Sequence, residues 1–150
     1  MRTVIAIIIF SVITGCASIT KESRWIEPGD NPAQLLVYRD AGSHSKAMAA
    51  NFGSSQNYIV EIMEKEYIDI LLPPGKEIFK TSGDGSTGGT LNITLSPDTK
   101  TCLQIESNPA QWAAVAIPIL LAVIPAYNVN EVECPSEEYL ASFKRLNIEL

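Results

Sequence analysis

The sequence predicts a mainly β protein, an antiparallel β-sandwich with one short C-terminal helix. Short segments in which apolar and polar residues alternate recur along the chain, as in strands with one buried and one solvated face. Proline, glycine and aspartate residues that form turns separate these segments at short intervals. That spacing is typical of sandwiches and argues against an alternating α/β fold.

Seven segments have the composition or the alternation of strands: 34–39, 58–63, 67–72, 76–80, 90–95, 100–106 and 128–133. The clearest is 90–95, where Leu91, Ile93 and Leu95 alternate with polar neighbours. Pro73-Pro74-Gly75 separates two strands, because proline cannot donate to a ladder and glycine can adopt positive φ. A weak strand is expected near 47–52, and the glycine-rich residues 81–89 are expected to form a flexible loop.

Residues 135–145 have a helical pattern instead. Ser136 can cap the N-terminus, and acidic residues of the first turn and basic residues of the last turn suit the helix dipole. Tyr139, Leu140, Phe143 and Leu146 recur at helical spacing, so one face is expected to pack on a sheet.

The N-terminus predicts export. Arg2 precedes an apolar run of about nine residues, which suits a signal peptide, whereas a membrane span needs roughly twenty. The run ends in Ile13-Thr14-Gly15-Cys16, which resembles the lipobox of bacterial lipoproteins. The resemblance implies that residues 1–15 are removed and that Cys16 carries lipid, such as palmitate. Ala17, in place of aspartate, favours the outer membrane, with the domain facing the periplasm.

Composition limits the partners. Residues 16–33 are predicted to be a tether and 34–150 a single domain. The chain has 11 Lys+Arg against 17 Asp+Glu, a net charge of −6 at pH 7. Such an acidic protein has no electrostatic reason to bind nucleic acid. The predicted partners are membrane lipid, through the acyl anchor, and an envelope protein or a second copy of the chain.

The three cysteines divide into the predicted lipid site and a pair. Because an oxidising envelope permits disulfides, Cys102 and Cys134 are expected to form one. Their strands need a bulge or a strand end near Pro135 for the two side chains to meet.

A family resemblance accompanies this pattern. The stretch Tyr67–Lys76, with its Leu72-Pro73-Pro74-Gly75-Lys76 turn, then Leu91–Leu95 and Thr101–Ile105, resembles a group of small bacterial lipoproteins with a domain of unknown function. The resemblance implies a transthyretin-like or carboxypeptidase-regulatory-like β-sandwich over roughly residues 33–146. It brings no established activity and no catalytic residues.

No motif in the sequence predicts catalysis. The only histidine, His44, lies in a polar loop, and the glycine-rich residues 81–89 lack the lysine and helix of a phosphate loop. Six acids are expected to form a solvated face and not a catalytic pair: Glu61, Glu64, Glu66, Asp69, Glu131 and Glu133. The protein is therefore expected to be no enzyme, with no cofactor and no metal.

The segment 109–127 departs from the rest. No charge occurs between Ser107 and Asn130, and Pro118 and Pro125 interrupt the run, which is too short and broken for a membrane span. Three interpretations stay open: it completes the core, it docks a partner or a second copy, or it dips into the membrane with its aromatic residues at the interface. The residues expected to make membrane or partner contact are Trp112, Ile117, Ile119, Leu120, Leu121 and Tyr127.

The sequence thus predicts a non-enzymatic envelope lipoprotein, a binding or scaffolding module held at the membrane by Cys16. The alternative is a lipoprotein that inserts into or perturbs the membrane through residues 109–127.

Overall fold

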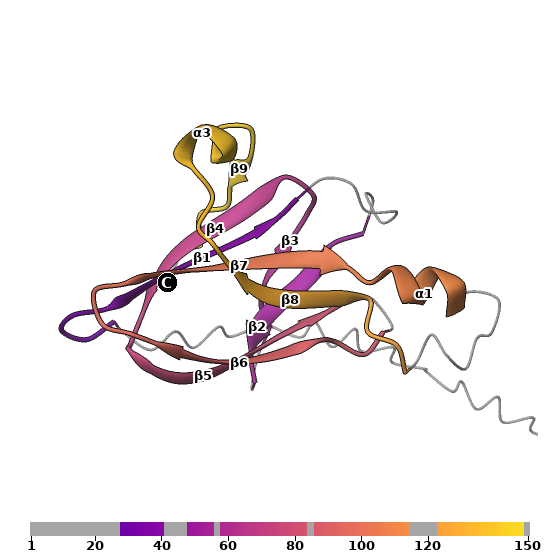
Figure 1. Cartoon of the computed structure of the whole chain (residues 1–150), viewed down its shortest axis with the longest axis horizontal. Helices are drawn as coiled ribbons and strands as arrows, with labels where there is room; N and C mark the ends of the chain where they lie inside the picture. Colours follow the sequence, from indigo (N-terminus) through magenta and orange to yellow (C-terminus); the bar gives the residue numbers. More distant parts are fainter. Residues whose placement is uncertain (1–27, 41–47, 56–57, 84–85, 115–122, 149–150) are drawn as a thin grey trace, which may run out of the picture.

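Two β-sheets face each other in the computed structural model, which describes residues 28–40, 48–55, 58–83, 86–114 and 123–148 (Figure 1). The five-stranded sheet has the order β8-β7-β1-β4-β9, and the four-stranded sheet has the order β3-β2-β5-β6. The predicted mainly β sandwich is therefore confirmed. The strands are β1 (Ala33–Arg39), β2 (Ala50–Ser54), β3 (Tyr58–Ile62), β4 (Glu66–Leu72), β5 (Gly75–Ser82), β6 (Thr90–Leu95), β7 (Lys100–Ser107), β8 (Tyr127–Val132) and β9 (Lys144–Arg145).

Most neighbouring strands run antiparallel, with two exceptions. β1 pairs in parallel with β7, and β4 pairs in parallel with β9. Parallel neighbours need a crossover connection. The connection from β1 to β7 passes through the other sheet, because β2, β3, β5 and β6 lie between them in the sequence. The sandwich is thus antiparallel in the main, with a parallel pair at the centre of its larger sheet.

The core fills the space between the inner faces of the sheets. β1 contributes Leu35 and Val37, both 0% exposed, and the four-stranded sheet contributes Phe52 and Phe79, whose stacked rings lie 5.3 Å apart. Full burial of one such side chain stabilises a fold by roughly 1.5–3 kcal/mol. The alternation read from the sequence places these residues inward, because successive side chains of a strand point to opposite faces.

The turns follow the local chemistry of the sequence. Gly75 has a φ of 146°, a conformation that side chains with a Cβ rarely adopt, and it opens β5 after the two prolines. Lys65 and Asp98 take the left-handed conformation in the turns before β4 and before β7. The weak strand expected near 47–52 is β2, two to three residues further along the chain.

The helix predicted over 135–145 is wrong in its extent. Helix α3 covers only Glu137–Leu140, with the Ser136 hydroxyl accepting a hydrogen bond from the Tyr139 N–H at 3.2 Å. Lys144 and Arg145 form β9 instead, because the Lys144 and Leu146 N–H groups donate to the carbonyls of Lys65 and Tyr67 beside β4. Pairing with the sheet edge overrides the helical pattern in this part of the chain.

A second short helix, α1 (Pro109–Ala114), was not predicted and opens the apolar segment. It projects from one end of the sandwich, beyond β7 and β8 (Figure 1). No helix in the described part of the chain is long and apolar enough to cross a membrane.

Candidate functional site

The apolar segment leaves and re-enters the sandwich at one point. The Asn108 N–H donates to the Ala126 carbonyl at 2.9 Å, which closes the base of the segment. The Asn108 side-chain oxygen accepts a hydrogen bond from the Ala110 N–H, so Asn108 caps α1, with Pro109 following it. Residues 109–126, here called the insertion, therefore form an excursion with a fixed base.

The glycine-rich loop holds that base from the other sheet. Thr87 accepts a hydrogen bond from the Ala126 N–H, and its hydroxyl donates to the Val123 carbonyl at 3.2 Å. The Tyr127 carbonyl accepts hydrogen bonds from the Gly89 N–H at 3.2 Å and from the Thr81 hydroxyl at 3.1 Å. The sheet and the insertion are thus joined through backbone groups and through the hydroxyls of Thr81 and Thr87.

Of the loop predicted at 81–89, Thr81 and Ser82 belong to β5, and the described residues after them connect the antiparallel strands β5 and β6. A Cβ on Gly88 would lie 1.4 Å from the Thr81 carbonyl oxygen. Glycine is required at this position by the close approach of two backbone segments, not by a need for mobility.

A buried arginine lies beside the same base. Arg39, at the end of β1, is only 1% exposed. Its Nη1 donates to the carbonyls of Met48 at 2.6 Å and Ile62 at 3.1 Å, and its guanidinium lies 4.7 Å from the centre of the Tyr127 ring. The Tyr127 hydroxyl donates to the same Met48 carbonyl at 3.2 Å. One cation thus connects β1, β3, β8 and Met48, which precedes β2.

The structure corrects the role predicted for Tyr127. Its side chain is 1% exposed, so it contacts the core and not a membrane or a partner. It begins β8 with its side chain on the inner face. There the Arg39 guanidinium packs on its ring, and the Met48 carbonyl accepts a hydrogen bond from its hydroxyl.

The chain after β8 crosses the outer face of the five-stranded sheet. We call residues 133–143 the strap. A disulfide between Cys102 of β7 and Cys134 holds its start, so the predicted pair is present. Cys102 lies opposite Val132, where β8 ends, so the expected strand end brings the cysteines together. β9 holds the other side of the strap against β4.

The strap buries a second, smaller apolar cluster. Leu36 and Tyr38 of β1 are 1% and 6% exposed beneath it, and Phe143 of the strap is 8% exposed. Phe143 and Tyr139 both pack against the Tyr38 ring, with centroids 5.9 and 6.4 Å away. The outer face of this sheet is therefore apolar at its centre because the strap covers it.

Polar side chains at the edge of the strap bind one another. The Tyr139 hydroxyl donates to the Asp40 carboxylate, and this hydrogen bond raises the pKa of Tyr139 to about 12. The Lys65 ammonium lies 2.8 Å from Asp40 and 4.3 Å from the centre of the Phe143 ring. Burial raises the pKa of the nearby Tyr38, so both phenols stay neutral at pH 7.

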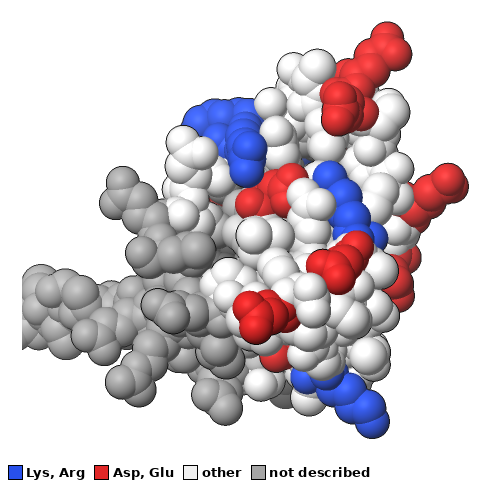
Figure 2. Space-filling view, turned by 90° about the vertical axis from the view of Figure 1, so that its left-hand side faces the viewer, with Lys and Arg blue, Asp and Glu red and all other residues white. Residues whose placement is uncertain are grey.

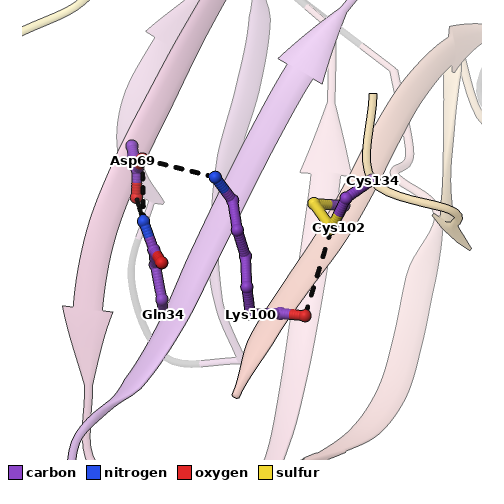
Figure 3. Close-up of polar contacts among 5 residues, drawn as sticks. All are labelled: Gln34, Asp69, Lys100, Cys102 and Cys134. Atoms are coloured by element: carbon purple, nitrogen blue, oxygen red, sulfur yellow. Dashed lines mark hydrogen bonds and ion pairs between the residues drawn. A yellow bond between two sulfur atoms is a disulfide. The ribbon is translucent and has the colours of Figure 1, made fainter. Parts of the chain in front are cut away.

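A further group of polar side chains lies on the same sheet (Figure 3). The Gln34 amide donates to both oxygens of the Asp69 carboxylate, at 2.8 and 2.9 Å, and the Lys100 ammonium lies 3.8 Å from that carboxylate. These side chains come from three adjacent strands, β4, β1 and β7. They link the strands laterally, and the partly exposed ion pair between Lys100 and Asp69 is worth only about 0–1 kcal/mol.

The six acids weighed in the sequence do not converge. Glu61 lies in the four-stranded sheet, whereas Asp69 and Glu131 lie in the other sheet with two strands between theirs. No group of three or more potential metal ligands occurs among the residues that the structure describes. At the end of the sandwich opposite α1, acidic and basic side chains are interspersed (Figure 2).

The remaining predicted contact residues all belong to the insertion. Trp112 lies in α1, while Ile117, Ile119, Leu120 and Leu121 lie outside the described residues, as do Cys16 and His44. Val123, which the sequence did not single out, is 69% exposed within the insertion.

Arg39 is a buried residue of this region that the sequence did not single out. The sequence does indicate that Arg39 is buried, because it continues the alternation of Leu35 and Val37 and so falls on the inward face of β1. A charged residue in phase with the core predicts a buried, hydrogen-bonded cation.

Comparison of the chain with family models, with curated proteins and with solved structures gives no match. The resemblance to small bacterial lipoproteins stays a prediction from the sequence.

Proposed function

We propose that this protein is a non-enzymatic envelope lipoprotein, in which lipidated Cys16 holds a β-sandwich at the membrane as a binding or scaffolding module. The observation that carries the proposal is the way in which its three cysteines divide between a lipobox-like sequence and a disulfide. Cys16 ends a lipobox-like sequence, and the other two form a disulfide. Persistent disulfides are typical of oxidising compartments, and the bacterial periplasm is one of them.

The polar side chains described above support the binding role. Arg39 holds backbone carbonyls, Asp69 links strands, and Tyr139 with Asp40 holds the strap, so each is engaged in maintaining the fold. What the sandwich offers to other molecules is its outer faces, its strand edges and the insertion. Surfaces of this kind serve recognition by docking rather than by enclosing a substrate.

Replacing Cys16 with serine tests the anchor. Serine has no sulfur to accept the diacylglyceryl group, so we expect complete loss of lipid labelling and release of the protein from the membrane fraction. Cells are labelled with a fatty-acid analogue and then fractionated. Cys134→Ser is the matched control, because it also removes a sulfur but leaves the lipobox, and its labelling should equal wild type. Equal labelling of the Cys16→Ser protein would refute the anchor.

Contact of the insertion with the membrane is the second candidate function. Three observations favour it: α1 projects from the end of the sandwich (Figure 1), Val123 is 69% exposed, and the base is held by backbone hydrogen bonds. An apolar excursion with a fixed base can enter a lipid surface without disturbing the sheets. The correction for Tyr127 leaves Trp112, Ile117, Ile119, Leu120 and Leu121 as its proposed contacts.

Ile119→Asp separates this function from a role in the core. In the Cys16→Ser background, which lacks the anchor, we expect unchanged thermal unfolding and loss of co-sedimentation with phosphatidylethanolamine–phosphatidylglycerol vesicles. Ile78→Asp is the matched control, since Ile78 is 43% exposed on β5 and lies outside the insertion. Destabilisation by several kcal/mol would instead assign Ile119 to the core, because an unpaired buried charge is costly. Unchanged stability with unchanged vesicle binding would refute membrane contact.

A further inference from the structure

β6 is the outermost strand of the four-stranded sheet, and one of its two edges has no neighbouring strand. It pairs only with β5, in a register that puts Thr90 opposite Lys80 and Leu95 opposite Gly75. The Thr81 N–H donates to the Gly89 carbonyl in the same register. Because hydrogen-bonded and non-bonded pairs alternate in antiparallel sheets, the backbone groups of Thr90, Asn92 and Thr94 face away from β5.

These outward backbone groups make no hydrogen bond to any residue in the described part of the chain. The side chains of Thr90, Asn92 and Thr94 are exposed as well. A row of three such residues is a template for another strand.

The other sheet edges carry the features that usually block pairing. β3 carries the exposed Glu61 and meets its neighbour with a register shift, and β9 has only two residues, both charged. β8 carries Glu131, and its first residue is bonded to the glycine-rich loop. β6 has no charged residue, no proline and no register shift against β5. It is the edge among the described strands that lacks protection.

The inner side of this edge is apolar and incompletely covered. Leu91 and Ile93 pack against the core but are only half-buried, whereas Leu95 is 1% exposed. A strand added along β6 would bring its own inward side chains against Leu91 and Ile93. Covering that apolar surface favours association beyond the backbone hydrogen bonds.

We propose that two copies of this chain dimerise by antiparallel pairing of their β6 strands. The sequence of β6 complements itself about Asn92: Asn92 meets Asn92 of the second copy, Thr90 meets its Thr94, and Leu91 meets its Ile93. Polar side chains then oppose polar ones on the outer face, and apolar side chains oppose apolar ones on the inner face.

This register also uses every outward backbone group of the three exposed residues. A shift by one residue would turn the apolar side chains of one copy to the outer face of the other. The contact is isologous, as in most symmetric dimers, and gives a continuous eight-stranded sheet from two four-stranded ones. Because β6 is uncharged, no like charges oppose each other along the pair despite the net charge of each copy.

Crosslinking tests the register in the full chain, purified in a mild detergent. Directly opposed bonded residues have Cα atoms about 5.5 Å apart, within the range of about 4.4–6.8 Å that a disulfide spans. Asn92→Cys should therefore give a disulfide-linked dimer on mild oxidation. In Thr94→Cys the two introduced cysteines lie four residues apart along the pair, about 14 Å, so this matched variant should stay uncrosslinked. Equal crosslinking of both variants, or none in either, would overturn the proposal.

A second pair of variants tests dimerisation itself. Asn92→Lys places two like charges opposite each other at the dimer axis, and we expect it to weaken dimerisation by about tenfold or more. Asn130→Lys makes the same change at an exposed position of β8, on the other sheet, and should leave dimerisation unchanged. Sedimentation velocity measures the dimer, and circular dichroism shows that each variant is folded. A wild-type chain that stays monomeric, or equal dimerisation of both lysine variants, would contradict β6 pairing.

Discussion

Replacing Arg39 with methionine is expected to lower the free energy of unfolding by about 3–5 kcal/mol, because hydrogen bonds to a charged donor and a desolvated cation–π contact are lost together. The guanidinium is 1% exposed and serves the carbonyls of Met48 and Ile62 as well as the Tyr127 ring. Methionine fills much of the volume of the arginine stem, so the loss reports the polar contacts more than a cavity.

The expected loss of stability is large because a substitution at Arg39 cannot also remove the groups that accept its hydrogen bonds. Substituting both members of a buried polar pair with apolar groups can be nearly neutral. Here the acceptors are backbone carbonyls, and the Ile62 carbonyl loses a donor when any apolar side chain replaces Arg39. Arg39→Lys keeps the charge but not the planar fork of donors, so its loss should be intermediate.

Urea unfolding followed by circular dichroism measures these differences. Arg145→Met is the matched control, because Arg145 is exposed on β9, and a surface change of this kind is usually worth within about 0.5 kcal/mol. Equal stability of Arg39→Met and Arg145→Met would show that the buried cation contributes nothing to the fold.

Regular alternation explains what the sequence could predict. The segment 90–95 matches β6 residue for residue, and 100–106 matches β7 to within one residue, because a strand with one buried face must alternate. β2 was only weakly predicted, since its residues Asn51, Gly53 and Ser54 have low strand propensity and it depends on pairing with β3 and β5.

Long-range contacts explain what the sequence could not predict. The pattern of 135–145 is locally helical, but the carbonyls of Lys65 and Tyr67 draw residues 144–146 onto the edge of β4. Glycine in the 83–89 loop signals freedom when read locally, whereas Gly88 is present because Thr81 approaches it closely. Tyr127 closes an apolar run in the sequence, yet the Arg39 guanidinium makes it a core residue. In each case the deciding partner lies at least seven residues away in the sequence.

Removing the disulfide is expected to destabilise the protein by about 3–4 kcal/mol, because the crosslink closes a long loop and so restricts the unfolded chain. The two cysteines are 32 residues apart in the sequence, and the loop between them contains the entire insertion and β8. The variant is Cys102→Ala/Cys134→Ala. Alanine is preferred to serine, since Cys102 is 1% exposed and a hydroxyl there would be buried.

The loss should be concentrated in the strap. Without the disulfide, the strap is held by its aromatic contacts with Tyr38, by the Tyr139–Asp40 hydrogen bond and by the two residues of β9. Local opening would then require less free energy than global unfolding. We expect hydrogen exchange at the Lys144 and Leu146 N–H groups, which donate to Lys65 and Tyr67, to accelerate more than exchange in β5 and β6.

Reduction supplies the control within the same experiment. A reducing agent should give the wild-type protein the stability and the exchange pattern of the double alanine variant, and it should leave that variant unchanged. If the exchange rates of all strands rise by the same factor, the disulfide acts on the whole domain and not through the strap. If neither stability nor exchange changes on reduction, the packing of Phe143 and Tyr139 on Tyr38 is sufficient to hold the strap, and the crosslink adds nothing to the folded protein.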